Sequence, residues 1–503
     1  MVKRLFNFLF DDTSSLSVGR LMVKGITWLM IGVLVGRLAM FATRIIAARI
    51  LGKVPLGEFG LIESTVSMFV AYAGLGMGVA VSKNLAECCR IDAPRAGRIL
   101  GTVCLLSGSL FVVLLLALFL SSKGLAASLS PNPDFLASLR IGMLLSLLVP
   151  AALAMAILNA FQAFRHVTFA NVIQGLACLF LTLILAPIWG LNGYLLAFGG
   201  GLLLMVIYQG VIILSLCQEY NIQIRLKGMT QELPLIWRYG LPSMLSGVLI
   251  GPVTWATRAL LAKQADGLGE LGLYVAAFSL SSIFIAVSTL LYNVTVPILS
   301  SATNQEEKQA GIRRSIFLYW LAAIGLGLPM IALANHLTKF VLGPEFTKAG
   351  PILAIVSLAV GIRIFSMSFG SLLIVMDRVW HMALSTVAGE PIFLGLTFFL
   401  APLWGAQGLA LAYLISGLVT LILSYSISAR EMAWGRLPQL GLILTIALIG
   451  AAWLINGIAT PWLAMCSTIL LLGLYAITSI YLAFRYDLLG GLAARVPFGG
   501  RNR

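Results

Sequence analysis

The chain has 503 residues, of which 60% are hydrophobic and only 10% are charged. A soluble domain could not bury so much apolar surface, so the composition excludes a soluble globular protein and indicates a membrane protein. The net charge of +15 does not indicate nucleic-acid binding, because the basic residues lie mainly in short loops between apolar runs.

The apolar runs predict about fourteen transmembrane helices. Their expected ranges are 24–50, 58–82, 98–121, 140–163, 168–187, 191–216, 240–262, 271–299, 315–337, 350–376, 381–402, 405–428, 438–457 and 462–484. Alternating strand patterns are absent from the sequence, which argues against a closed β-barrel. The predicted fold class is therefore an all-α integral membrane protein.

Basic residues predict the orientation of the helices. The N-terminal segment 1–23 is basic and then apolar over about six residues, without the cleavage pattern of a signal peptide. About 22 lysines and arginines lie in the two termini and the even-numbered loops. The odd-numbered loops carry far fewer, namely Lys53, Lys123, Lys263, Lys339 and Lys348. Because cytoplasmic loops are enriched in Lys and Arg, both termini are expected in the cytoplasm.

The sequence contains an internal repeat. Three motifs return at an offset of about 214 residues. The matching pairs are Ala42–Arg44 with Ala256–Arg258, Leu56–Leu61 with Leu268–Leu273, and Ala186–Gly190 with Ala401–Gly405. Repeated halves in a membrane protein are typical of transporters.

The repeat predicts two lobes of six helices each. The lobes are expected at 24–217 and 240–430, joined by a cytoplasmic connector at 218–239. An even number of helices per repeat predicts a pseudo-twofold axis along the membrane normal. Two extra C-terminal helices at 431–484 and a cytoplasmic tail at 485–503 follow.

Four arginines stand out away from the ends of predicted transmembrane helices: Arg37, Arg44, Arg258 and Arg363. Arg49 and its repeat counterpart Lys263 lie at helix ends, where they are expected to reach the lipid headgroups. A charge at the bilayer centre costs about 2.5–3.5 kcal/mol on insertion scales, so each needs a reason. One interpretation is a basic cavity that binds a diphosphate, since guanidinium groups bind phosphate oxygens in a bidentate way. The alternative is that the arginines reach the lipid headgroups or pair with buried acids.

Two acidic residues, Glu63 and Glu390, also lie within predicted helices. They either neutralise the arginines or carry a coupling ion. Glu390 precedes Pro391, where an interrupted helix would expose backbone groups to a cavity, so it is the stronger candidate for coupling. The six cysteines and three dispersed histidines form no metal-ligand pattern, and no metal or cofactor is expected.

The chain resembles bacterial polysaccharide transporters, the O-antigen type oligosaccharide flippases of the multidrug/oligosaccharidyl-lipid/polysaccharide (MOP) superfamily. The resemblance is carried by Arg44–Gly52, Leu56–Leu61, Gly74–Gly78, Leu85–Glu87, Leu342–Phe346 and Ala349–Leu353. It implies a transporter rather than an enzyme. The implied cargo is an undecaprenyl-diphosphate-linked oligosaccharide, flipped from the cytoplasmic to the outer leaflet of the bacterial inner membrane by alternating access. This would serve polysaccharide biosynthesis, such as that of lipopolysaccharide.

The expected partners are the lipid-linked oligosaccharide, membrane lipids, and a polysaccharide polymerase or chain-length protein. Three alternatives stay open. A lipid II flippase would share the basic cavity, and a multidrug exporter of the same superfamily would favour acids and aromatics for organic cations. A membrane glycosyltransferase or polymerase would need a catalytic carboxylate pair, which the sequence does not indicate.

Overall fold

The computed structural model describes residues 18–73, 77–89, 91–130, 132–225, 249–301, 305–376, 378–429, 437–458 and 460–485. Within these ranges the regular elements are all helical. Eight of the described helices are long and apolar enough to cross a membrane. The residues divide into two compact units, Met1–Ala276 and Ala277–Arg503.

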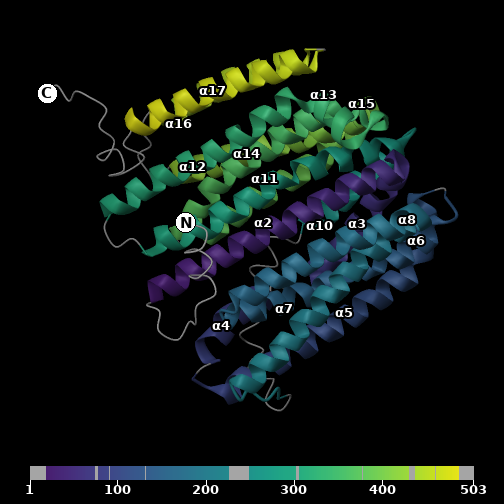
Figure 1. Ribbon diagram of the computed structural model, residues 1–503, viewed down its shortest axis with the longest axis vertical. Coiled ribbons are helices and arrows are strands. Elements are labelled where there is room, and N and C mark those ends of the chain that lie inside the picture. The colour runs from purple at the N-terminus through teal and green to yellow at the C-terminus, as the bar shows by residue number, and fades with distance from the viewer. Residues whose placement is uncertain are drawn as a thin grey trace. The chain divides into compact units, whose positions relative to one another are not determined.

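The first unit is a helical bundle (Figure 1). Within it α2 packs along α8, and α3 packs against α10. Its elements are α2 (Val18–Leu51), α3 (Lys53–Ala73), α4 (Met77–Cys88), α5 (Ala93–Leu129), α6 (Phe135–Gly142), η2 (Met143–Leu147), α7 (Leu148–Ala160), α8 (Phe164–Glu219), α10 (Ile250–Ala262) and the beginning of α11 (Gly267–Ser301).

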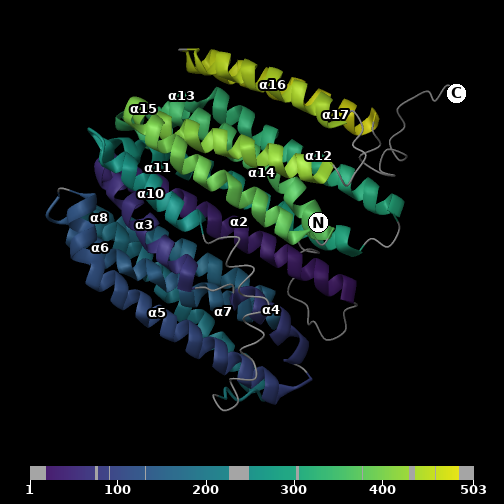
Figure 2. The same ribbon diagram turned by 180° about the vertical axis from the view of Figure 1, so that it is seen from behind.

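The second unit contains the rest of α11 and the helices that follow it (Figure 2). Within it α14 packs against both α12 and α15, while α16 and α17 pack against α12. Its elements are α12 (Gln305–Ala332), α13 (Ala334–Leu337), η4 (Thr338–Leu342), η5 (Pro344–Phe346), α14 (Ala349–Val375), α15 (Val379–Ala429), α16 (Leu437–Asn456) and α17 (Pro461–Arg485).

The helix α8 is a hairpin of two membrane spans. Its 56 residues would extend about 84 Å as one straight helix, far more than the roughly 30 Å of a bilayer core. The chain turns at Gly190, whose φ of 55° and ψ of −130° are not helical. A Cβ at Gly193 would collide with the Leu185 carbonyl oxygen, so the two arms meet closely just beyond the turn.

The helix α15 repeats this hairpin in the second unit. Gly405 has a φ of 54° and a ψ of −130°, and a Cβ at Gly408 would collide with the Leu400 carbonyl oxygen. The sequence motif around Gly190 therefore returns with the same backbone geometry, which supports the predicted repeat. With each hairpin counted as two spans, the eight candidate helices supply ten membrane crossings among the described residues. The predicted all-α membrane fold is confirmed.

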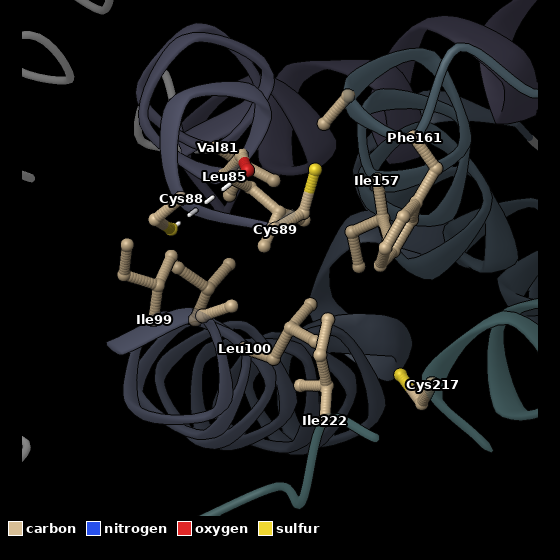
Figure 3. Close-up of a cluster of buried hydrophobic side chains, with 13 residues drawn as sticks. Val81, Leu85, Cys88, Cys89, Ile99, Leu100, Ile157, Phe161, Cys217 and Ile222 are labelled. Atoms are coloured by element: carbon tan, nitrogen blue, oxygen red, sulfur yellow. Dashed lines mark hydrogen bonds between the residues drawn. The ribbon is translucent and has the colours of Figure 1, made fainter. Parts of the chain in front are cut away.

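A buried cluster closes one end of the first unit (Figure 3). Cys88, at the end of α4, lies opposite Ile99 of α5, while Cys217 and Ile222 come from the end of α8 and the segment after it. The Cys88 thiol donates to the Asn84 carbonyl oxygen at 3.1 Å. These cysteines are buried among apolar side chains, so their thiols contribute to the packing of this cluster.

The same cluster anchors the beginning of the predicted connector. The Arg225 amide donates to the Gly97 carbonyl at 3.1 Å. A Cβ at Gly97 or Gly101 would collide with the carbonyl oxygen of Gln223 or Arg225, so two glycines of α5 accommodate this backbone. The rest of the connector, 226–248, lies outside the described residues, as do 1–17 and 486–503. The predicted lobe boundaries and the cytoplasmic termini therefore stay predictions.

Candidate functional site

In the first unit, Arg44 of α2 and Arg258 of α10 contact the same carboxylate, Glu63 of α3. Arg44 Nη2 lies 2.8 Å from Glu63 Oε1, and Arg258 Nη1 lies 3.4 Å from Glu63 Oε2. Arg258 Nη1 also donates to the Gly60 carbonyl oxygen at 2.9 Å. Residues three apart share a helix face, so Gly60 and Glu63 both present acceptors to α10.

A neighbouring hydrogen bond continues the contact between α3 and α10. Trp255 Nε1 donates to Thr65 Oγ1 at 3.1 Å. Three residues separate Trp255 from Arg258, so both side chains project from the same face of α10. These bonds fix the rotation of α10 and thereby aim Arg258 at Glu63.

This cluster, Arg44, Glu63 and Arg258, carries more positive than negative charge. The two arginines are counterparts in the repeat, but the position in the second repeat that matches Glu63 is Val275. Two guanidinium groups therefore share one carboxylate. The side chains are largely buried, with exposed fractions of 22%, 20% and 11% for Arg44, Glu63 and Arg258, so solvent screens this excess charge only in part.

Arg37 lies on the same helix, two turns before Arg44, at a distance of about 10 Å along the axis. Its side chain is exposed. It has no ion pair with another described residue. The structure therefore joins two of the four predicted arginines, Arg44 and Arg258, and leaves Arg37 as an exposed charge beside them.

In the second unit, Arg363 of α14 contacts Glu390 in the first arm of α15. Arg363 Nη1 lies 3.7 Å from Glu390 Oε1, and the Glu390 side chain is only 4% exposed. Arg363 Nη2 donates to Ser416 Oγ at 2.7 Å, and its Cζ lies 4.1 Å from the centre of the Tyr413 ring. A guanidinium over an aromatic face gains a cation–π attraction, so three side chains, those of Glu390, Ser416 and Tyr413, hold Arg363 in place.

The helix interruption expected at Pro391 is not observed. The helix α15 continues through Pro391, and its non-helical residue is Gly405, fourteen residues later. The proline ring occupies the helix interior, while the turn requires the positive φ that only glycine adopts readily. Glu390 therefore lies on a continuous helix, where it pairs with Arg363.

Sequence reasoning missed Tyr413 and Ser416. They lie three residues apart in the second arm of α15, so they share a face. That spacing was visible in the sequence, but it gave no indication that the face meets Arg363 of another helix. Two further residues that it missed, Lys53 and Asp266, form an ion pair of 2.9 Å.

Lys53 is the first residue of α3, and Asp266 directly precedes α11. Beside this pair, a Cβ at Gly57 would collide with the Leu268 carbonyl oxygen, and one at Gly272 would collide with the Lys53 carbonyl oxygen. The two glycines belong to the repeated motifs. The contact is therefore reciprocal, with the glycine of each motif meeting the backbone of the other segment.

The second unit also contains an apolar cavity of about 290 Å³ between α12, α14, α15 and α16. Its only hydroxyl, on Ser357, lies 3.2 Å from the Ser281 hydroxyl. The lining is Trp320, Ala323, Ile324, Gly327, Leu328, Ile331, Ser357, Leu358, Gly361, Ile362, Phe365, Leu414, Leu418, Leu421 and Ile449. Such a cavity suits a hydrocarbon chain and offers nothing to a charged ligand.

A family model described as polysaccharide biosynthesis protein matches residues 22–303, more than half of the chain. The chain belongs to this family. The match includes Arg44, Glu63 and Arg258, and it ends before Arg363. No curated protein matches the chain.

Solved structures place this family member in the MOP fold. The lipid II flippase MurJ, in an inward closed conformation, has a TM-score of 0.73 and 13% identity over 92% of this chain and 99% of that chain. An inward-facing multidrug resistance MATE transporter of the MOP superfamily has a TM-score of 0.65 and 16% identity over 81% and 98%. A MOP superfamily transporter from Pyrococcus furiosus Vc1 has a TM-score of 0.56 and 16% identity over 84% and 97%. The chain is thus a multi-pass membrane protein of a transporter family in polysaccharide biosynthesis.

Proposed function

We propose that this protein flips an undecaprenyl-diphosphate-linked oligosaccharide from the cytoplasmic to the outer leaflet of a bacterial inner membrane. The observation that carries the proposal is the shared carboxylate: Arg44 and Arg258, counterparts in the two repeats, both contact Glu63. Paired guanidinium groups in a largely buried setting suit the oxygens of a diphosphate. Arg37 adds a further positive charge on the same helix.

The membrane potential favours this direction of transport. An anion that leaves a negative cytoplasm gains about 2.3 kcal/mol per charge per 100 mV. Transport of a diphosphate outward therefore does not require a coupling ion. If an ion is used, Glu63 and Glu390 are the candidate carriers.

The lipid tail would stay in contact with apolar helix surfaces while the diphosphate crosses. The cavity between α12, α14, α15 and α16 is a place for part of that tail, since its walls are apolar and its hydroxyl is already paired. The diphosphate-linked oligosaccharide would then use the surface around Arg44 and Arg258, and the lipid tail would use the apolar cavity.

Alternating access would require the contact around Lys53 and Asp266 to break. In the orientation predicted from the basic loops, Lys53 lies on the outer side. The ion pair and the reciprocal glycine contacts would then close the outer side, and the cytoplasmic side would receive the substrate first. A polysaccharide polymerase or a chain-length protein would act on the flipped product.

The test is the leaflet distribution of undecaprenyl-diphosphate-linked glycan in cells depleted of this protein, with complementation by the wild type. We expect the glycan to accumulate in the cytoplasmic leaflet and to return to normal on complementation. A normal distribution with normal surface glycan would overturn the proposal.

A lipid II flippase is the second candidate, favoured by the fold shared with MurJ. In that case depletion would leave surface glycan intact and trap lipid II in the cytoplasmic leaflet. A multidrug exporter is less favoured, because two arginines around one carboxylate repel organic cations.

A further inference from the structure

Glu63 occupies the position in which an external anion would contact both arginines. Each of its two oxygens faces a different guanidinium, Oε1 toward Arg44 and Oε2 toward Arg258. Carboxylate and phosphate groups both present two oxygens to such donors and are bound by arginine in the same way. The protein thus satisfies its own anion site with a side chain.

We propose that the Glu63 carboxylate is a built-in competitor that holds the place of a substrate phosphate and is displaced when the diphosphate binds. This inference rests on the proposed function and adds how the site is regulated. With no substrate, Glu63 neutralises one of two cations that would otherwise face each other in a low-dielectric setting. With substrate, the more highly charged diphosphate takes over both arginines.

The contacts of Arg258 fit such an exchange. The Gly60 carbonyl holds its Nη1 at 2.9 Å independently of Glu63, so the guanidinium stays oriented when the carboxylate leaves. Its Nε is buried and has no hydrogen-bond partner among the described residues. An incoming phosphate would therefore meet an oriented guanidinium whose Nε–H is available as a hydrogen-bond donor.

Glu63 itself is held by few contacts. Its hydrogen bonds to other described side chains are those to Arg44 and Arg258. Displacement therefore breaks no side-chain hydrogen bond among the described residues other than those to the two arginines, which then bind the phosphate instead. Competition from Glu63 also lowers the affinity for the substrate. A lower affinity favours release of the substrate on the outer side of the membrane.

The test is the binding of inorganic pyrophosphate to the purified full chain in detergent, measured by isothermal titration calorimetry for the wild type and Glu63→Gln. Removal of the competing charge should tighten binding by about tenfold or more. Glu63→Ala, measured in parallel, should give the same gain and guards against a folding defect of either variant. A role of Glu63 in merely orienting the arginines predicts the opposite sign, namely weaker binding.

Glu58→Gln is the matched control. Glu58 is a buried carboxylate on the same helix, five residues earlier, but it accepts from Asn132 Nδ2 at 3.0 Å instead of from an arginine. Its substitution should leave the affinity for pyrophosphate unchanged.

Equal or weaker binding by both Glu63 variants, or no binding by any form, would overturn the competition. The proposed function is judged separately by export. Tighter binding by Glu63→Gln together with a normal glycan distribution and normal surface glycan in cells depleted of this protein would support the competition and overturn the proposed cargo.

Discussion

Gly190 and Gly405 adopt the same non-helical backbone conformation at corresponding positions of the two repeats, with φ and ψ of 55° and −130° and of 54° and −130°. Each residue turns a long helix back on itself. The sequence repeat is therefore also a repeat of local geometry. In the second unit the turn brings both arms of α15 to Arg363, with Glu390 on the first arm and Ser416 on the second.

Substitution of the turning glycines should destabilise the protein. Gly405→Ala forces a side chain into a conformation that costs about 1–3 kcal/mol, which should lower the melting temperature in detergent. Gly395→Ala on the same helix is the control, because a Cβ there meets no atom within 4 Å and alanine favours the helix. Equal melting temperatures for the two variants would contradict the role assigned to Gly405.

The paired arginines should be essential for transport. Arg44→Ala and Arg258→Ala should each abolish glycan export without loss of the protein from the membrane. Lysine at either position should restore export only in part, because an ammonium group keeps the charge but not the bidentate geometry. Surface glycan and membrane protein level are measured together, and wild-type export in both alanine variants would rule out the anion site.

The pair of Arg363 and Glu390 distinguishes structural pairing from ion coupling. If pairing dominates, Arg363→Ala leaves a buried carboxylate without its cation and lowers the melting temperature, and the double variant with Glu390→Gln recovers much of the loss. A double-mutant cycle should give a coupling energy of about 1–3 kcal/mol. A coupling role for Glu390 would instead appear as lost transport in Glu390→Gln at unchanged stability.

Cross-linking should test the contact at the beginning of α3. The variant Lys53→Cys with Asp266→Cys, joined in membranes by a short bifunctional thiol reagent that attaches through disulfides, should block glycan export, and reduction should restore it. Cys104 and Cys466 are exposed and should first be replaced by serine. Either cysteine alone is the control, and export that persists in the cross-linked protein would show that this contact need not open.

Filling the apolar cavity should test its role in holding the lipid tail. Gly327 lines the cavity, and a Cβ there meets no atom within 4 Å, so Gly327→Leu adds volume without a backbone clash. We expect slower glycan export at unchanged stability. Gly108→Leu on α5, where a Cβ also meets no atom, is the control, and equal export by both variants would remove the cavity from the transport pathway.

Much of the fold is readable from the sequence because hydropathy and turn chemistry are local. Apolar runs of bilayer length predict the helices independently of how they pack. The boundaries expected between 168–187 and 191–216 and between 381–402 and 405–428 fall at or beside Gly190 and Gly405, where the hairpins turn. The exception is Pro391. The sequence suggested a break there, but α15 continues, since neighbouring helices and local adjustment tolerate a proline within a membrane helix.

The sequence identified the charged residues of the candidate site but not which of them contact one another. The sequence by itself determined the membrane class, the internal repeat, the family and the intramembrane charges. Only the tertiary structure decided that Arg44 and Arg258 share Glu63 and that Arg363 pairs with Glu390 over Tyr413. Arg258 and Glu63 lie 195 residues apart in the chain. The pairs between consecutive helices also depend on how each helix is rotated by its packing contacts, which no local pattern encodes.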